Sequence, residues 1–153
     1  MALEHRFFCL REGEVSYAEY MKYFKIKFEV SIHDDVMRYM NDTLMWIPCT
    51  HLSVRHRRKA HGLMLYGDTI INQEGVEMFY HVIESWYRLF SKAPEKFQLD
   101  GGIIIEADRT VSSPPKVHTI EVERDLLLEK LRILLNYANQ VIEGEFFILH
   151  LGI

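Results

Sequence analysis

The sequence predicts an α+β fold: a single domain over residues 1–153, with a mixed or antiparallel sheet against two long helices and the C-terminal strand in the core. Residues 25–32 alternate strictly between apolar and polar side chains, which is typical of a strand with one buried face. Apolar residues recur at helical spacing over 73–91 and 122–143. The apolar run 146–153 ends the chain, and we expect it to be a strand inside the sheet. The elements do not alternate as regular β-α-β units, which favours α+β over α/β.

The first half of the chain adds shorter elements. Residues 4–11 are expected to form the first strand, and residues 16–23 a short helix, since Ser16 and Glu19 have the spacing of a capping box. Two aspartates at the start of residues 34–40 favour a second short helix, because carboxylates stabilise a helix N-terminus.

The middle of the chain carries turn signals between apolar segments. Residues 44–49 form a short apolar segment, and residues 63–71 indicate a strand, a Gly-Asp bend and a second strand. Asn72 is the expected cap of the helix over 73–91, and Pro94 follows its end.

A glycine pair separates two apolar segments beyond that helix. Phe97 and Leu99 indicate a strand, residues 100–102 a turn, and residues 103–105 a buried strand. Residues 110–116 contain two consecutive prolines and predict an exposed loop.

The final helix has an apolar stripe at heptad-like steps, and Gly144 is expected to end it. The stripe consists of Leu127, Leu131, Leu134, Ala138 and Val141. A coiled coil, and with it a homodimer, is the alternative. A helix inside the domain is favoured because further apolar residues widen the stripe.

Composition is that of a globular protein: 48% of the residues are hydrophobic and 26% are charged. The net charge of -4 argues against a general nucleic-acid binder, which is usually basic. Cys9 and Cys49 lie among apolar residues and are expected to be free thiols. Residues 1–13 do not resemble a signal peptide, and no apolar stretch is long enough for a membrane span. We therefore expect a cytoplasmic protein without a membrane partner.

The strongest local charge lies in residues 51–61, which contain Arg55, Arg57, Arg58 and Lys59 and no acidic residue. The favoured interpretation is a solvated loop or an edge strand, since charges at a sheet edge oppose aggregation. A contact with an acidic protein comes next. A phosphate contact with nucleic acid is less favoured, because no aromatic residues are interleaved with the basic ones.

Acidic residues cluster around the two prolines, with Glu106 and Asp108 before them and Glu121 and Glu123 after them. Carboxylate pairs can perform acid-base or metal chemistry. Carboxylates spread over loops and helix starts more often form a solvated surface, or an interface with a basic partner.

The histidines do not predict a metal site. His51, His56 and His61 recur every five residues, which matches neither one helix face nor one strand face. His81 and His150 lie on or beside apolar stripes and are expected in the core. Nucleophile elbows and phosphate-binding glycine loops are also absent from the sequence. We therefore expect neither an enzyme nor a cofactor.

Three stretches within residues 60–153 resemble a group of small bacterial immunity proteins, which neutralise polymorphic or contact-dependent toxins. They are residues 65–71, a helix with Trp86, Leu89 and Phe90 followed by Ala93, Pro94, Phe97 and Leu99, and residues 148–153. The resemblance implies a cytosolic, non-catalytic protein that binds a cognate toxin domain. It implies no catalytic residues.

The expected contact depends on the charge of the toxin. For a nuclease we expect the acidic residues Glu106, Asp108, Glu121 and Glu123. For an acidic toxin we expect Arg55, Arg57 and Arg58. The alternative hypothesis is a small nucleic-acid-binding protein that uses residues 51–61.

Overall fold

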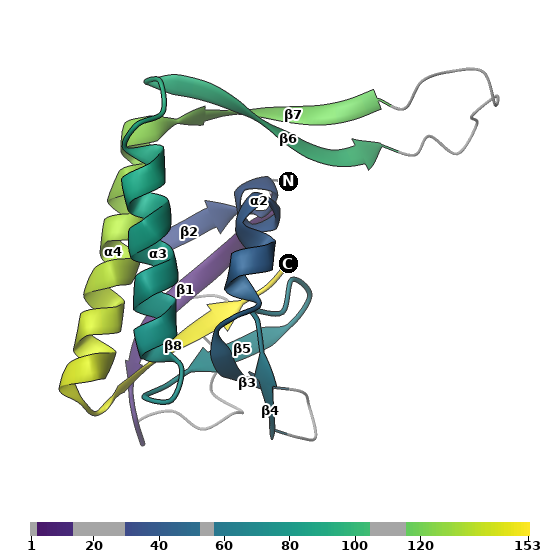
Figure 1. Cartoon of the computed structure of the whole chain (residues 1–153). Coiled ribbons are helices and arrows are strands. Elements are labelled where there is room, and N and C mark those ends of the chain that lie inside the picture. Colours follow the sequence, from purple (N-terminus) through teal and green to yellow (C-terminus); the bar gives the residue numbers. More distant parts are fainter. Residues whose placement is uncertain (1–2, 14–29, 53–56, 105–115) are drawn as a thin grey trace.

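The computed structural model describes residues 3–13, 30–52, 57–104 and 116–153 and has an α+β fold, as the sequence predicts (Figure 1). A six-stranded sheet has the order β2-β1-β8-β5-β3-β4, and every pairing in it is antiparallel. A separate ribbon pairs β6 with β7. The elements are β1 (Glu4–Arg11), β2 (Val30–His33), α2 (Asp34–Leu44), β3 (Pro48–Leu52), β4 (Arg57–His61), β5 (Asp68–Ile71), α3 (Val76–Phe90), β6 (Lys96–Ile104), β7 (Lys116–Glu123), α4 (Arg124–Glu143) and β8 (Phe146–Leu151).

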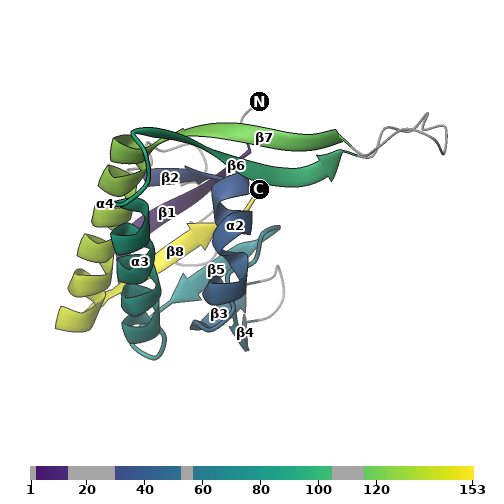
Figure 2. The same cartoon turned by 45° about the horizontal axis from the view of Figure 1, so that its top comes forward.

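The helices α3 and α4 stand side by side on one face of the sheet, and α2 lies beside α3 (Figure 1). The ribbon of β6 and β7 crosses the ends of α3 and α4 and projects beyond the sheet (Figures 1 and 2). It therefore lies over the end of the molecule opposite the edge strand β4.

The C-terminal apolar run forms β8, which lies between β1 and β5 as an interior strand of the sheet. Its alternating side chains contribute to two apolar clusters on opposite faces. Ile148 belongs to the larger cluster with the helices. Leu149 and Leu151 belong to the smaller cluster, together with Phe8 and Ile70 from the neighbouring strands. The prediction of a buried C-terminal strand is confirmed.

The predicted helix over 73–91 begins three residues later than expected, at Val76. Asn72 organises the turn before it, because its side-chain oxygen accepts from the Glu74 amide. The carbonyl of Asn72 accepts from the amides of Gly75 and Val76. Asn72 therefore stabilises the start of α3 from a position one turn before Val76, the first residue of the helix.

The apolar stripe of the final helix is buried inside the molecule. Leu131, Leu134 and Ala138 are fully buried, and they join the same cluster as residues of α3. The expectation of a helix packed within the fold, rather than a coiled coil, is confirmed. The helix ends as predicted at Gly144, whose positive φ of 121° favours glycine.

Several predicted boundaries are wrong. The final helix starts at Arg124, because Val122 belongs to β7. Residues 63–66 form a loop before β5 instead of a strand. Residues 100–102 do not turn the chain: β6 runs through them, with a register irregularity between Asp100 and Ile103. A bulge of this kind lets a strand absorb glycines that would otherwise indicate a turn.

Other expectations are refined or lie outside the described ranges. The helix predicted over 34–40 extends to Leu44, and the apolar segment 44–49 contributes only its last residues, from Pro48, to β3. The predicted helix 16–23, most of the predicted strand 25–32 and nearly all of the predicted loop 110–116 lie outside the described residues.

Neither Cys9 nor Cys49 is in a disulfide, as predicted. Cys49 is buried, and its thiol donates to the carbonyl of Gly62 at 3.1 Å. Burial raises the pKa of the Cys49 thiol to about 11, so the thiolate is scarce at neutral pH. Cys49 is thereby suited to packing rather than to nucleophilic chemistry.

The close approach of β3 to the start of α3 gives a stability prediction. A Cβ at Gly75 would lie 1.8 Å from the carbonyl oxygen of Pro48. Gly75→Ala should therefore lower the free energy of unfolding by about 2–3 kcal/mol, measured by urea denaturation. Ser85→Ala, on an exposed position of the same helix, should change it by less than about 0.5 kcal/mol. Equal stability of the two variants would contradict the close approach.

Candidate functional site

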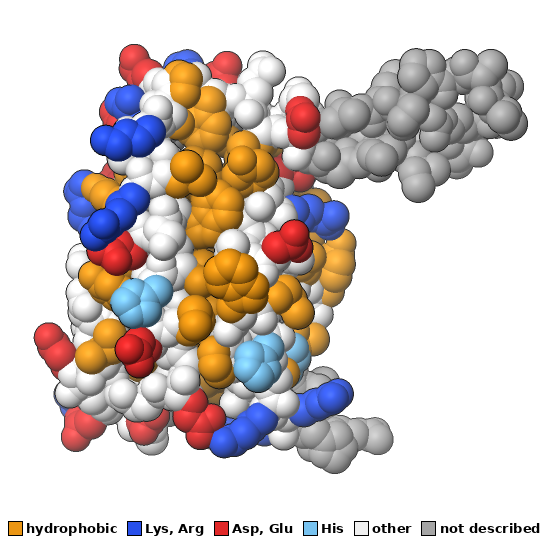
Figure 3. Space-filling view, in the orientation of Figure 1, with side chains coloured by type: hydrophobic (Ala, Val, Ile, Leu, Met, Phe, Trp, Pro, Cys, Tyr) orange, Lys and Arg blue, Asp and Glu red, His pale blue; other side chains and the backbone are white. Residues whose placement is uncertain are grey.

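Large apolar side chains are exposed along the seam between α2 and α3. They are Tyr39 and, just after α2, Trp46, together with Met78 and Leu89 on α3. Trp46 is 59% exposed and Leu89 is 57% exposed. Figure 3 shows the hydrophobic side chains gathered in a broad stripe over this face. Continuous apolar surface of this kind is typical of a binding site for another protein.

Trp86 lies at the centre of this surface and is held from several sides. Its indole Nε1 donates to Thr43 Oγ1 at 2.7 Å, which links α3 to α2. The Tyr39 ring meets its edge at 5.5 Å between centroids, and the Phe90 ring stacks on it at 5.4 Å. These contacts preorganise a rigid aromatic surface.

The surface is hollowed into two adjoining depressions, which we call together the α2–α3 groove. The first has a volume of about 340 Å³ and the second about 330 Å³, and both are bordered by Leu89. Their principal lining residues are Thr43, Trp46, Met78, Val82, Trp86 and Leu89 for the first, and Tyr39, Leu89, Phe90, Pro94 and Phe97 for the second.

Besides the exposed His81, two polar residues line the first depression, and both hydroxyl groups are directed toward partners in the chain itself. Thr43 Oγ1 donates to the carbonyl of Met40 and accepts from Trp86, and Ser85 Oγ donates to the carbonyl of His81. The first depression therefore offers little to a strongly polar ligand. It offers a large area to an apolar protein face.

The predicted acidic contact is only partly described. Glu121 and Glu123 lie exposed on β7, where Lys96 Nζ is 3.6 Å from a carboxylate oxygen of Glu121 and 4.0 Å from one of Glu123. Glu106 and Asp108 lie outside the described residues. The carboxylates that are described belong to a solvated ion-pair cluster, in which such pairs contribute little to stability.

The predicted basic contact forms the edge strand β4, which agrees with the edge-strand interpretation of this segment. Arg57 pairs in register with Leu52 and Arg58 with His51, so the two arginines point to opposite faces of the sheet. Arg55 lies outside the described residues. The acidic and basic residues that are described lie at opposite ends of the molecule, on β7 and β4 (Figure 1).

A buried chain of polar side chains, which the sequence analysis did not identify as a unit, crosses from β8 to α2. His5 Nδ1 lies 2.8 Å from His150 Nε2, and His5 Nε2 lies 2.9 Å from Asp34 Oδ1. Arg38 Nε donates to Asp34 Oδ2 at 2.6 Å, and Arg38 Nη2 donates to the Tyr66 hydroxyl at 2.8 Å. The predicted core position of His150 is confirmed, whereas His81 is exposed on α3 and that prediction is wrong.

The hydrogen bonds fix the tautomers of the two neutral histidines. His5 Nε2 faces a carboxylate and must donate, so its Nδ1 accepts and His150 Nε2 donates. His150 Nδ1 then carries a buried lone pair without a donor in the described part of the chain. Burial lowers the pKa of His5, against the opposing effect of Asp34, and it lowers the pKa of His150 well below the usual value.

No family model, curated protein or solved structure matches this chain. Within the described ranges, none of the helices is long and apolar enough to cross a membrane. In those same ranges, no group of three His, Cys, Asp or Glu side chains is placed to hold a metal ion.

The buried histidines give a prediction for pH. Both are neutral in the folded protein and take up protons on unfolding below their usual pKa of 6.5. The free energy of unfolding should therefore fall as pH drops below about 6.5, by up to about 1.4 kcal/mol per pH unit for each histidine. Urea denaturation between pH 5 and 8 measures the slope.

Two variants identify the source of that slope. His150→Phe removes one proton-binding group and should flatten the dependence, whatever its effect on stability at pH 8. His81→Gln removes an exposed histidine and should leave the dependence as it is in the natural protein. A slope unchanged by His150→Phe would contradict the assignment.

Proposed function

We propose that this chain is a non-catalytic immunity protein that binds a cognate bacterial toxin domain and neutralises it through the α2–α3 groove. The observation that carries the proposal is the exposed apolar surface around Trp86, to which the side chains of Trp46 and Leu89 contribute. Tryptophan, tyrosine and methionine are enriched in protein interfaces, where a few such residues supply most of the binding energy.

Some of the residues that carry the resemblance to immunity proteins also border the groove. Trp86, Leu89, Phe90 and Phe97 belong to the second of the three similar stretches, and all four border the groove. The resemblance alone assigns no contact residues. We assign the contact to the groove residues, because their exposed apolar surface supports an apolar contact rather than the charged contacts expected from the sequence.

The charged residues have a secondary role in this proposal, which is to steer the toxin. Charges at the rim of an interface mainly set the association rate and its dependence on salt. The carboxylates of β7 suit a basic toxin such as a nuclease, and the arginines of β4 suit an acidic one. A binding site centred on the groove lies between these two ends of the molecule (Figure 1).

Growth rescue tests the proposal most directly. The protein encoded immediately upstream is expressed in a bacterial host with and without this chain. Toxicity that only this chain relieves, together with a stable complex of the two purified proteins, is the expected result. Toxicity without relief would overturn the proposal for that protein pair.

The alternative function, nucleic-acid binding through residues 51–61, has a separate test. It requires affinity for RNA or DNA that falls steeply with salt and depends on Arg57 and Arg58. Absence of retention on nucleic acid at low salt would eliminate it. Our proposal expects that absence, since the two arginines face opposite sides of the sheet.

Groove variants should separate binding from folding. Met78→Glu and Leu89→Glu each place a charge on an exposed position of the groove and should weaken the toxin complex about tenfold or more, measured by calorimetry. Ile142→Glu makes the same change at a similarly exposed position of α4, away from the groove, and should leave affinity unchanged. Equal effects of all three variants would contradict the assignment of the contact.

Reversing the charges at the two ends of the molecule should change the association rate of the toxin complex. The double variants Glu121→Lys with Glu123→Lys, and Arg57→Glu with Arg58→Glu, should change the association rate in opposite directions, and more at low salt than at high salt. Stopped-flow measurements at two salt concentrations give both values. An association rate unaffected by either double variant would remove the steering role and leave the groove contact standing.

A further inference from the structure

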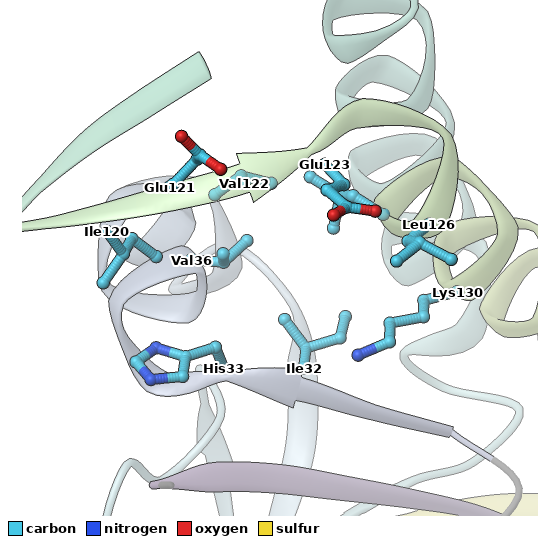
Figure 4. Close-up of a pocket in the computed structure, with 10 residues that line it drawn as sticks. Ile32, His33, Val36, Ile120, Glu121, Val122, Glu123, Leu126 and Lys130 are labelled. Atoms are coloured by element: carbon cyan, nitrogen blue, oxygen red, sulfur yellow. The ribbon is translucent and has the colours of Figure 1, made fainter. Parts of the chain in front are cut away.

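A third hollow lies away from the α2–α3 groove, between β2, β7 and α4, and has a volume of about 440 Å³ (Figure 4). Its floor is apolar and consists of the buried side chains of Ile32, Val36, Val122 and Leu127. Leu126 borders it and is 55% exposed. The volume and the apolar lining are typical of a pocket for a small molecule.

Lys130 gives this hollow a distinctive chemistry. It is half-buried on α4, and Figure 4 shows its ammonium directed into the hollow near Ile32. Among the described residues, it has no carboxylate within ion-pair distance. An ammonium against apolar walls without a counter-ion favours an anionic group in the ligand.

The other polar groups limit which anion fits. Glu121 and Glu123 border the hollow, and both lie near Lys96. Figure 4 shows that Glu121 points away from the floor, whereas the carboxylate of Glu123 lies on the side of the hollow. These carboxylates disfavour a multiply charged anion such as a phosphate ester. They are compatible with a single negative charge placed at Lys130.

His33 provides a second donor from the β2 side. Its Nδ1 accepts from the amide of Asp35 at 3.2 Å, and Asp35 Oδ2 lies 3.6 Å from the same nitrogen. In the neutral tautomer that accepts this bond, Nε2 carries the proton and is a donor. The imidazole is 37% exposed, so a ligand in the hollow can reach it.

We propose that this hollow binds an aliphatic monocarboxylate, such as a medium-chain fatty acid. The carboxylate accepts hydrogen bonds from Lys130, with His33 as the second donor. The alkyl chain covers the floor around Val36 and Leu127 and shields Leu126 from water. The site is separate from the proposed toxin contact, which lies in the α2–α3 groove.

Calorimetry with three ligands of equal chain length tests the proposal on the full chain. Sodium decanoate should bind, while decanol and decylamine should bind about tenfold more weakly or not at all, because only decanoate pairs with the ammonium. Amide shifts in NMR spectra with decanoate should cluster on β2, β7 and the first turns of α4.

Two variants make the test specific. Lys130→Gln keeps most of the side-chain length but removes the charge, and should weaken decanoate binding about tenfold without changing the affinity for decanol. Lys92→Gln, at a lysine beside the α2–α3 groove, should leave decanoate binding unchanged. Equal binding of the three ligands, unchanged decanoate binding in Lys130→Gln, or amide shifts located in the groove would each overturn the proposal.

Discussion

The fold depends on the insertion of β8 between β1 and β5. This strand joins the two halves of the sheet, and both of its faces are buried. Ile148 contacts the helix side, while Leu149 and Leu151 build the second cluster on the opposite face. Because β8 pairs in register with β1 on one side and with β5 on the other, it is the strand that makes one continuous sheet of the two halves. The packing of α3 and α4 on one face follows from the apolar surface that β8 completes.

The buried histidine chain links this central strand to the α2–α3 groove. His150 on β8 contacts His5 on β1, which contacts Asp34 at the start of α2. Arg38 then binds the same aspartate one turn further along. At the other end of α2, Thr43 is held by Trp86 of α3. Because α2 is fixed at both ends, the wall that it contributes to the groove is preorganised, and preorganisation of a surface reduces the entropy lost in binding.

Local patterns in the sequence were sufficient for the strands and helices that carry clear periodicity. The stripe of α4 and the C-terminal apolar run predicted their elements, because each pattern reflects burial within one segment. The ribbon was missed, since Gly101 and Gly102 are compatible with both a turn and a bulged strand, and only the pairing with β7 decides between them. The predicted edge position of the basic segment agrees with β4.

The candidate site was less accessible to sequence reasoning. The groove needs α2 beside α3, and no periodicity in the sequence indicates that these two helices touch. Trp86 also falls within the apolar spacing of its helix, which by itself favours a core position. Its Nε1 bond to Thr43 shows the distinction: the ring packs while its edge stays at the surface. No local sequence pattern indicated the buried position of His5, because its partners Asp34 and His150 are 29 and 145 residues away in the chain.

The helix α2 contributes residues to both proposed binding sites. Its first turns contribute Val36 to the hollow at Lys130, and its later turns contribute Tyr39 and Thr43 to the groove. The hydrogen bonds of Asp34 and Arg38 hold the helix between these two surfaces. A ligand that changes the position of α2 therefore acts on both sites, since the helix is a rigid element anchored to β1 and α3. The ribbon is a second physical link between the two surfaces, because Phe97 of β6 borders the groove and pairs in register with Val122 of β7 in the floor of the hollow.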